Sequence, residues 1–387
     1  MRFPEFSGEW EMVSLQDIAT INPKSDPLQN TFIYIDLEAV EKGELRKIQE
    51  IMREEAPSRA QRVIDNNDIL FQCVRPYQKN NYIHRILNTS NQQWVASTGY
   101  AQIRTTELPN YIYHLLNTDE FNRKVMVRCT GSSYPAINSE DLATIHLYYT
   151  PDKKEQLKIS RLLDLLDKRI ATQNKIIEDL KKLKSAISKH LFARKDLLET
   201  TICLSNIATL KNGYAFQSGK YNALGKWKIL TITNVPGERY INDEDCNCII
   251  NLPNDIQDHQ VLKEGDILIS LTGNVGRVSL CKNGNYLLNQ RVGLLQLAKN
   301  VNQEFLYQIL SSQRFENSMI ACGQGAAQMN IGKGDVENYV LPYSSNGNNI
   351  LFAAKILHSY DECIINELRR LTLLTMQKQY LLTQMFI

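Results

Sequence analysis

The chain has 387 residues, of which 43% are hydrophobic and 22% charged, and its formal net charge is +2. This length is too great for one ordinary domain and suits two domains of roughly 150 residues with connecting segments. No apolar run approaches the roughly 20 residues of a membrane span, and the N-terminus lacks the apolar region of a signal peptide. Eight scattered cysteines form neither a disulfide framework nor a zinc pattern, so we expect a soluble protein of the reducing cytoplasm.

The first 150 residues have the mixed character of an α/β domain. Their β-branched and aromatic residues indicate strands at 33–35 and 69–74, and a short strand at 145–149 that ends before Pro151. A helix is expected over 111–116, and a loop over 128–137 comes before the last strand.

The clearest helix in the sequence follows Pro151. Its apolar residues recur at steps of four and three, the heptad pattern of a coiled-coil seam: Ile159, Leu163, Leu166, Ile170, Ile177, Leu180, Ile187 and Leu191. About 40 helical residues span about 60 Å, so part of this helix must pack outside a globular domain. The stretch 152–194 also carries twelve Lys and Arg against six Asp and Glu, which fits equally a solvated face or a face for phosphates or a partner.

The second half of the chain repeats these features. A turn leads into a strand at 265–270, and the segment 305–310 matches the helix expected over 111–116. A second long amphipathic helix follows, with a stripe formed by Ala353, Leu357, Tyr360, Ile364, Leu371, Leu374, Leu381 and Met385. The two helices can bury each other's stripes, and we expect an antiparallel pair because a twofold axis relating the copies would then cross it.

The two halves are an internal repeat with an offset of about 194 residues. Asp167, Ile170 and Lys184 recur as Asp361, Ile364 and Lys378, and the segment 15–21 resembles 204–210. A tandem duplication builds a pseudo-twofold object. Such an object can contact two separate places on a long, roughly symmetric partner such as DNA.

The predicted fold class is α/β, or α+β, with two such domains separated by two long antiparallel helices that form a coiled coil. The expected domains are 1–150 and 195–342, and the expected spacer helices are 151–194 and 343–387. The residues expected to form the coiled-coil spacer are Leu163, Leu166, Ile170, Ile177, Leu180, Ile187, Leu357, Ile364, Leu371, Leu374 and Leu381.

The sequence lacks the familiar motifs of catalysis. It has no glycine-rich dinucleotide loop after a strand, no phosphate-loop lysine after Gly276, and no Gly-x-Ser-x-Gly elbow. Its six histidines show no metal-ligand spacing. These absences favour a binding protein over an enzyme, with no catalytic residue and no metal site expected.

Polar, aromatic and basic residues gather instead in loops at matching positions of the two copies. Amides can pair with adenine and arginine with guanine, whereas lysine and serine mostly hold phosphates. Each residue alone also fits an ordinary turn, so the interpretation rests on the recurrence of the loops. The candidate DNA-binding residues of the first copy are Arg75, Tyr77, Gln78, Lys79, Asn80, Ser97, Thr98, Tyr100, Ser132, Ser133 and Tyr134. Those of the second copy are Tyr214, Phe216, Gln217, Ser218, Lys220, Thr272, Asn274, Asn289, Gln290, Arg291 and Gln328.

Several segments, repeated in a fixed order, give the chain a family resemblance. They are 2–10 with 15–19, the target-domain opening 212–218, the strands 266–273 and 288–292, the loop 328–331, and the helix 155–192. Over its whole length the chain resembles the specificity subunit of a type I restriction-modification system. The first copy departs from the second, since it has Ser-Tyr-Pro at 133–135 where the second has Ala-Gln-Met at 327–329.

The resemblance implies two target recognition domains, each reading one half of a split double-stranded DNA sequence across a gap set by the spacer helices. Two methyltransferase subunits would dock on the chain and methylate adenine at N6. Two restriction subunits would join them to translocate and cut unmethylated DNA. S-adenosylmethionine, ATP and Mg²⁺ are then expected on the partner subunits, with no cofactor on this chain and no membrane partner.

Two other interpretations stay open. The first is a non-catalytic coiled-coil scaffold without DNA specificity, which predicts no dependence on DNA. The second is a nuclease that uses carboxylates such as Asp65, Asp68 and Asp266. It is less favoured, because Asp68 and Asp266 lie at matching positions before a strand, where capping a turn explains them.

Overall fold

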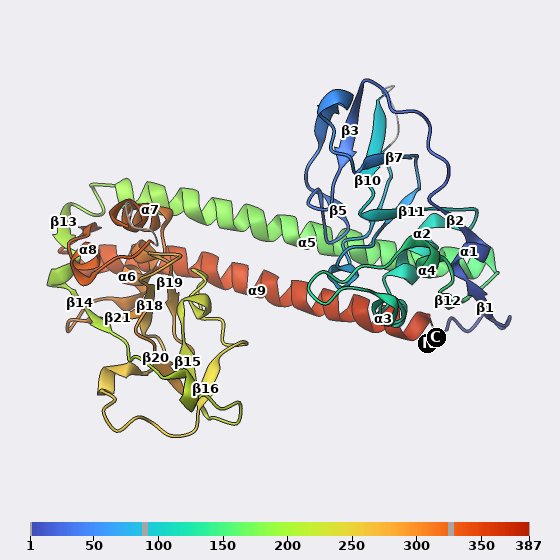
Figure 1. Cartoon of the computed structure of the whole chain (residues 1–387). Coiled ribbons are helices and arrows are strands. Elements are labelled where there is room, and N and C mark those ends of the chain that lie inside the picture. The colour runs from blue at the N-terminus through green and yellow to red at the C-terminus, as the bar shows by residue number, and fades with distance from the viewer. Residues whose placement is uncertain (1, 87–91, 324–328, 387) are drawn as a thin grey trace. The chain divides into compact units, whose positions relative to one another are not determined.

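The computed structural model describes residues 2–86, 92–323 and 329–386 (Figure 1). Its contacts divide the chain into two compact units. Unit 1 comprises residues 1–174 and 370–387, and unit 2 comprises residues 175–369. Each unit therefore contains part of both long helices, α5 (Lys153–Ala193) and α9 (Gly347–Met385). Within the described ranges, no helix is long and apolar enough to cross a membrane.

Unit 1 is built from three small sheets and a hairpin. The antiparallel pair is β1 (Glu11–Ser14) with β12 (His146–Tyr149). One four-stranded sheet has the order β6 (Gln49–Met52), β3 (Thr31–Ile35), β10 (Gln93–Ser97) and β7 (Ala60–Ile64). The other has the order β2 (Ala19–Ile21), β11 (Tyr100–Thr105), β8 (Ile69–Gln72) and β9 (Tyr82–Ile83). The hairpin joins β4 (Val40–Glu41) to β5 (Glu44–Leu45).

Short helices complete unit 1. They are α1 (Leu15–Ile18), α2 (Pro109–Leu116), α3 (Asp119–Arg128) and α4 (Ser139–Ala143), with 3₁₀ turns at Arg53–Glu55 and Pro76–Gln78. The apolar face of α2 packs into a core that also contains Ile159 of α5, Leu382 near the end of α9, and Phe386 directly after that helix. The ring of Phe386 lies 5.3 Å from that of Tyr111 and 6.3 Å from that of Trp10, centroid to centroid.

Unit 2 repeats the three sheets of unit 1 in the same strand order, whereas its described residues include no counterpart of the β4–β5 hairpin. The antiparallel pair is β13 (Thr200–Cys203) with β22 (Val340–Tyr343). The two four-stranded sheets have the orders β16 (Asn247–Ile249), β15 (Trp227–Leu230), β20 (Tyr286–Leu288), β17 (Val261–Leu262), and β14 (Ala208–Asn212), β21 (Val292–Leu297), β18 (Ile267–Ser270), β19 (Val278–Leu280). The parallel pair of β15 with β20 corresponds to that of β3 with β10.

The helices of unit 2 repeat as well. They are α6 (Gln303–Leu310), α7 (Gln313–Cys322) and α8 (Lys333–Glu337), with 3₁₀ turns at Leu204–Asn206, Ser218–Lys220, Ile232–Asn234 and Asp258–Gln260. The helix expected over 305–310 lies within α6, and its counterpart over 111–116 lies within α2. The predicted α/β fold class with an internal repeat is confirmed.

The long helices pair in antiparallel fashion within each unit. In unit 1 the Lys378 Nζ of α9 lies 2.5 Å from the Asp167 Oδ1 of α5. In unit 2 the Lys184 Nζ of α5 lies 2.5 Å from the Asp361 Oδ1 of α9. Among the expected spacer residues, Leu163, Leu166, Ile177, Leu357, Ile364 and Leu374 are buried, and Ile170, Leu180, Ile187, Leu371 and Leu381 are half-buried. The heptad stripe is therefore the face on which the helices meet.

Candidate DNA interface

Backbone hydrogen bonds gather the predicted loops of unit 2 into one cluster. The Leu271 N–H donates to the Arg291 carbonyl at 3.0 Å, and the Ile331 N–H donates to the Leu271 carbonyl at 2.9 Å. The Gly273 N–H donates to the Met329 carbonyl at 3.0 Å. Segments separated by up to 60 residues are thus fixed side by side at the ends of β18, β20 and β21.

Unit 1 contains the same three hydrogen bonds. The Cys73 N–H donates to the Gly99 carbonyl at 2.9 Å, and the Ile137 N–H donates to the Cys73 carbonyl at 3.1 Å. The Arg75 N–H donates to the Pro135 carbonyl at 2.7 Å. We call these three hydrogen bonds in each unit the loop frame. It makes Arg75 equivalent to Gly273 and Pro135 equivalent to Met329.

Two aromatic side chains and one arginine dominate the surface of the unit 1 loop frame. Tyr77 and Tyr134 are 51% and 63% exposed, so most of each ring faces solvent. The Arg75 guanidinium carbon lies 4.4 Å from the centre of the Tyr134 ring, so the two groups stack. Ser132 and Ser133 are exposed in the same loop. These residues can meet a ligand without rearrangement of the core.

Gln72, which the sequence analysis did not select, organises the loop that follows β8. Its buried amide donates to the Val74 carbonyl and the Gln78 Oε1, at 2.8 and 2.9 Å. The Gln72 Oε1 accepts the Asn80 N–H at 3.1 Å, while the Asn81 Oδ1 accepts the Gln72 N–H at 2.8 Å. The available signal was an amide at the end of the otherwise apolar run of β8. Gln78 and Asn80 are positioned by Gln72.

Three other predicted residues of unit 1 have structural partners. Tyr100 is fully buried and its hydroxyl donates to the Asp36 carbonyl at 3.3 Å. Ser97 is also buried, and its hydroxyl oxygen accepts the Gly99 N–H at 3.2 Å. The Lys79 Nζ lies 2.5 Å from the Asp119 Oδ1 of α3. We leave Tyr100 and Ser97 out of the proposed interface, because residues 94–97 of β10 and 100–103 of β11 are all buried in the core. The neighbouring Thr98 is half-buried.

The entrance loop of unit 2 forms a shallow hollow. The rings of Tyr214 and Phe216 lie 4.8 Å apart, and with Gln217 and Lys220 they line a space of about 430 Å³. The Tyr214 hydroxyl donates to the Asp255 Oδ1 at 2.8 Å, which raises the pKa of Tyr214. Ser218 is exposed beside them.

Close backbone packing explains the glycine at the start of this loop. A Cβ added to Gly213 would lie 2.1 Å from the Asn289 carbonyl oxygen. Tyr214 therefore bridges directly to Asn289, which brings the entrance loop against residues 289–291. Asn274, Gln290 and Arg291 are exposed on this part of the loop frame, and Thr272 is half-buried beneath them. Gln328 lies outside the described residues.

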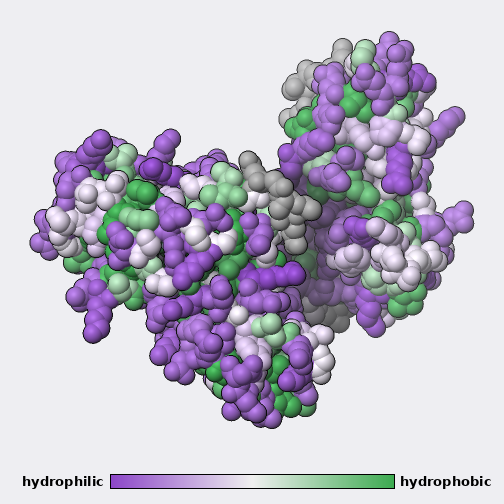
Figure 2. Space-filling view, turned by 60° about the vertical axis from the view of Figure 1, so that its left-hand side comes forward, coloured by the Kyte–Doolittle hydropathy of each residue, from purple (hydrophilic) through white to green (hydrophobic). Residues whose placement is uncertain are grey.

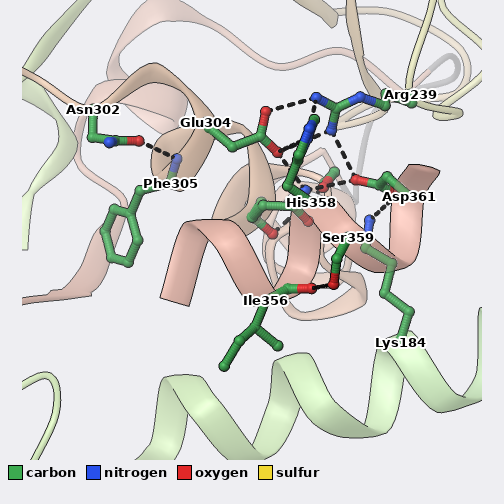
Figure 3. A network of polar contacts seen from close by, with 11 residues as sticks. Lys184, Arg239, Asn302, Glu304, Phe305, Ile356, His358, Ser359 and Asp361 are labelled. Carbon is green, nitrogen blue, oxygen red and sulfur yellow. Dashed lines mark hydrogen bonds and ion pairs between the residues drawn. The ribbon is translucent and has the colours of Figure 1, made fainter. Parts of the chain in front are cut away.

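A buried charged network joins the body of unit 2 to both long helices (Figure 3). The Arg239 Nη2 lies 2.6 Å from the Glu304 Oε2 of α6, and its Nη1 lies 2.9 Å from the Asp361 Oδ2 of α9. The Arg239 Nη2 also lies 3.0 Å from the His358 Nδ1, and Lys184 reaches Asp361 from α5. Burial acts to lower the pKa of Arg239, but hydrogen bonding to Glu304 and the negative charges of Glu304 and Asp361 act together with Tyr240 to raise the pKa above its ordinary value.

Unit 1 has a different network at the equivalent place. His114 of α2 is fully buried, with its Nε2 2.9 Å from the Asp164 Oδ1 and its Nδ1 4.0 Å from the Asp167 Oδ2. Lys378 completes the network on Asp167. The sequence repeat marked Lys184, Asp361, Asp167 and Lys378, but it did not indicate the arginine or the histidine that ties them to the domains.

The acidic residues considered for a nuclease have structural partners. The Asp68 Oδ2 accepts the Asp65 N–H at 2.7 Å, and the Asp266 Oδ2 accepts the Lys263 N–H at 2.8 Å. Both cap the turn before a strand, as expected. Among the residues that the structure describes, no group of three or more His, Cys, Asp or Glu side chains is placed to hold a metal ion.

Comparisons with known proteins agree with this architecture. The family model for the type I restriction modification DNA specificity domain matches residues 7–182 and 199–375. The specificity subunit of the type I restriction enzyme MjaVIII of Methanocaldococcus jannaschii is 27% identical over 54% of this chain and 53% of its own length. That of HindI of Haemophilus influenzae is 24% identical over 49% of this chain and 39% of its own length. The chain thus spans about half, or less, of the curated relatives it matches.

Two solved structures share the fold. One comes from work on complex assembly and conformational transition of the type I R-M system, and matches with a TM-score of 0.59 and 20% identity over 97% of both chains. The other is the type I restriction-modification S subunit from M. genitalium, with a TM-score of 0.59 and 16% identity over 98% of this chain and 96% of that chain. With a family match in both halves, each covering one copy of the repeat, this chain belongs to the type I restriction-modification specificity subunits.

Proposed function

We propose that this chain reads a bipartite DNA sequence for a type I restriction-modification complex, one half-site for each unit. The observation that carries the proposal is the loop frame. The same three backbone hydrogen bonds recur in both units, yet the side chains on them differ, as with Arg75 and Gly273. A shared frame with different side chains suits two readers of different sequences on the same kind of ligand.

We assign residues 1–150 and 195–342 to the two recognition domains, and 151–194 and 343–387 to the spacer helices. The spacer would set the unread gap between the half-sites. This chain would supply the sequence specificity of the complex and no catalytic group. Its partners would carry S-adenosylmethionine, ATP and Mg²⁺.

The docking of two methyltransferase subunits and two restriction subunits is part of the same proposal. In unit 1, α5 and α9 present Leu165, Leu373, Met376 and Tyr380 to solvent. The face drawn in Figure 2 is mainly hydrophilic, with hydrophobic residues in small groups, so such exposed apolar side chains on a helix are candidates for partner contact.

The near-neutral charge of +2 bears on the division of labour with these partners. Neutralising phosphates requires cations, and affinity that depends on them falls steeply with salt. We expect weak, salt-sensitive DNA binding by the chain alone and tight, specific binding by the assembled complex. Tight sequence-specific binding by the isolated chain would contradict this division.

The decisive experiment co-expresses the chain with its methyltransferase subunits in a host that lacks adenine methylation, followed by modified-base sequencing. The expected result is N6-methyladenine in one split motif on both strands, and none when this chain is omitted. A methylome that stays empty although all subunits are present and assembled would contradict the proposal and favour the scaffold. Adenine methylation without a split motif would contradict two-part reading.

A further inference from the structure

Arg75 has an unusual backbone for an arginine. Its φ and ψ are both 54°, in the left-handed region that disfavours residues with a Cβ. Two hydrogen bonds hold it there: its N–H donates to the Pro135 carbonyl at 2.7 Å, and its carbonyl accepts the Gln78 N–H at 3.0 Å. The surrounding loop thus imposes the conformation, and such imposed strain is concentrated at functional sites.

The side chain of Arg75 is oriented but has no polar partner. Its guanidinium stacks on the Tyr134 ring at 4.4 Å. Among the described residues, no hydrogen bond or ion pair joins its nitrogen atoms to an acceptor, whereas the guanidinium groups of Arg104 and Arg128 are bound to acceptors in the body of unit 1. Stacking fixes the plane of the group and leaves its hydrogen-bond donors free, which prepares it for a planar acceptor pair.

The second unit shows what the loop frame requires at this position. There the equivalent residue is Gly273, with a φ of 70°. Glycine adopts such a conformation without steric cost, so the frame forms with no side chain at all. The arginine of unit 1 is therefore not needed for the fold of the loop. It occupies a left-handed backbone conformation that glycine would adopt more easily.

We propose that Arg75 is a specificity-determining residue that reads a guanine in the half-site of unit 1, through the O6 and N7 acceptors of its major-groove edge. This inference rests on the proposed function. A guanine edge offers two coplanar acceptors that match an arginine fork, which a stacked guanidinium presents in a fixed plane. A phosphate contact needs no such fixation, because a mobile lysine serves as well.

The test compares the motifs methylated by complexes that carry wild-type chain, Arg75→Gly or Arg75→Lys. Arg75→Gly keeps the loop frame, as Gly273 demonstrates, and removes only the side chain. We expect both variants to lose discrimination at one base pair of one half-site by about 10- to 100-fold, the usual effect of one bidentate pair. The rest of that half-site and the whole of the other should be unchanged.

Lys42→Gly is the matched control. Lys42 is an exposed residue of unit 1 with a φ of 50°, so this change removes one positive charge and the same kind of backbone strain elsewhere. We expect the complex with Lys42→Gly to methylate the same motif as the wild type. Both Lys42→Gly and Arg75→Gly should change the thermal stability of the chain only slightly.

Other outcomes distinguish a failure of guanine reading by Arg75 from a failure of the proposed function. A uniform loss of methylation with an unchanged motif would identify a phosphate contact and overturn the reading of guanine. An unchanged motif at unchanged rate would overturn any role of Arg75 in specificity, although the proposed function would stand. If the wild-type complex gives no split motif, the proposed function itself fails.

Discussion

The network around Arg239 predicts a large loss of stability on Arg239→Met. The Arg239 side chain is 8% exposed, as is that of Asp361, and its guanidinium contacts two carboxylates at 2.6 and 2.9 Å. Methionine fills much of the same space but leaves Glu304 and Asp361 without this cation. Breaking a buried ion pair in this way costs about 3–5 kcal/mol. Because Lys184 still contacts Asp361, we expect about 3 kcal/mol, near the lower end of that range.

The free energy of unfolding should be measured by urea denaturation, with hydrogen exchange to locate the change. Faster exchange is expected in α6 and in residues 356–364 of α9, because Arg239 ties these helices to its own loop. Arg277→Met is the control, since its contact with Glu316 at 3.5 Å lies on the surface of the same unit. It should cost only about 0–1 kcal/mol.

The pH dependence of this loss has a definite sign. Burial acts to raise the pKa of Glu304, but hydrogen bonds from Arg239 and Gln308, together with the charges of Arg239 and His358, hold the pKa below its ordinary value. The stability that Glu304 contributes is thus present above its ordinary pKa and is lost as the pH falls through the lowered pKa. The difference between wild type and Arg239→Met should shrink on acidification. Equal costs for Arg239→Met and Arg277→Met at neutral pH would refute the reasoning.

Two further predictions concern unit 1. Burial lowers the pKa of His84 to about 4. The residue at the equivalent place in unit 2 is Cys281, which is equally buried. The equivalence follows from the backbone, because the His84 N–H donates to the Asp68 carbonyl and the Cys281 N–H donates to the Asp266 carbonyl. As the pH falls, histidine in the unfolded chain binds a proton at a higher pH than buried His84 does in the folded protein. The free energy of unfolding of the wild type should therefore decrease by on the order of 2 kcal/mol between pH 6.5 and pH 4. In urea titrations at both pH values His84→Cys should lack this dependence, and an identical slope for both proteins would contradict it. Leu166 is buried in the seam, so Leu166→Asp should lower the free energy of unfolding by at least the roughly 2–5 kcal/mol of a core truncation. It should also allow more than one gap length in the methylated motif. Asn174→Asp, at an exposed position of the same helix, is the control and should have neither effect. Retention of one sharp gap length would argue against the seam as the spacer.

Local patterns in the sequence predicted most of the architecture. The heptad steps of α5 and α9 follow from a period of 3.5 residues, and the strands are indicated by runs of β-branched and aromatic residues. Tyr100 shows where this reasoning stopped. It is expected in a loop among the candidate DNA-binding residues, but it begins β11, whose residues 100–103 are all buried.

Local sequence patterns did not predict contacts between residues that are far apart in the sequence. Arg239 contacts Glu304 and Asp361, which are 65 and 122 residues away in sequence. Nothing near Arg239 in the sequence distinguishes it from an ordinary surface cation. The strain at Arg75 was equally hidden, since a positive φ on arginine is imposed by the hydrogen bonds of the loop frame and not by its neighbours.

The packing of Phe386 against Tyr111 and Trp10 has a consequence for synthesis on the ribosome. Unit 2 is continuous in sequence from residue 175 to residue 369, so it can complete its core once that stretch has emerged. Unit 1 begins first but needs Leu382, Met385 and Phe386 to close its core. Its apolar surface therefore stays uncovered while all of unit 2 is translated, and the N-terminal half of the protein is the last to mature.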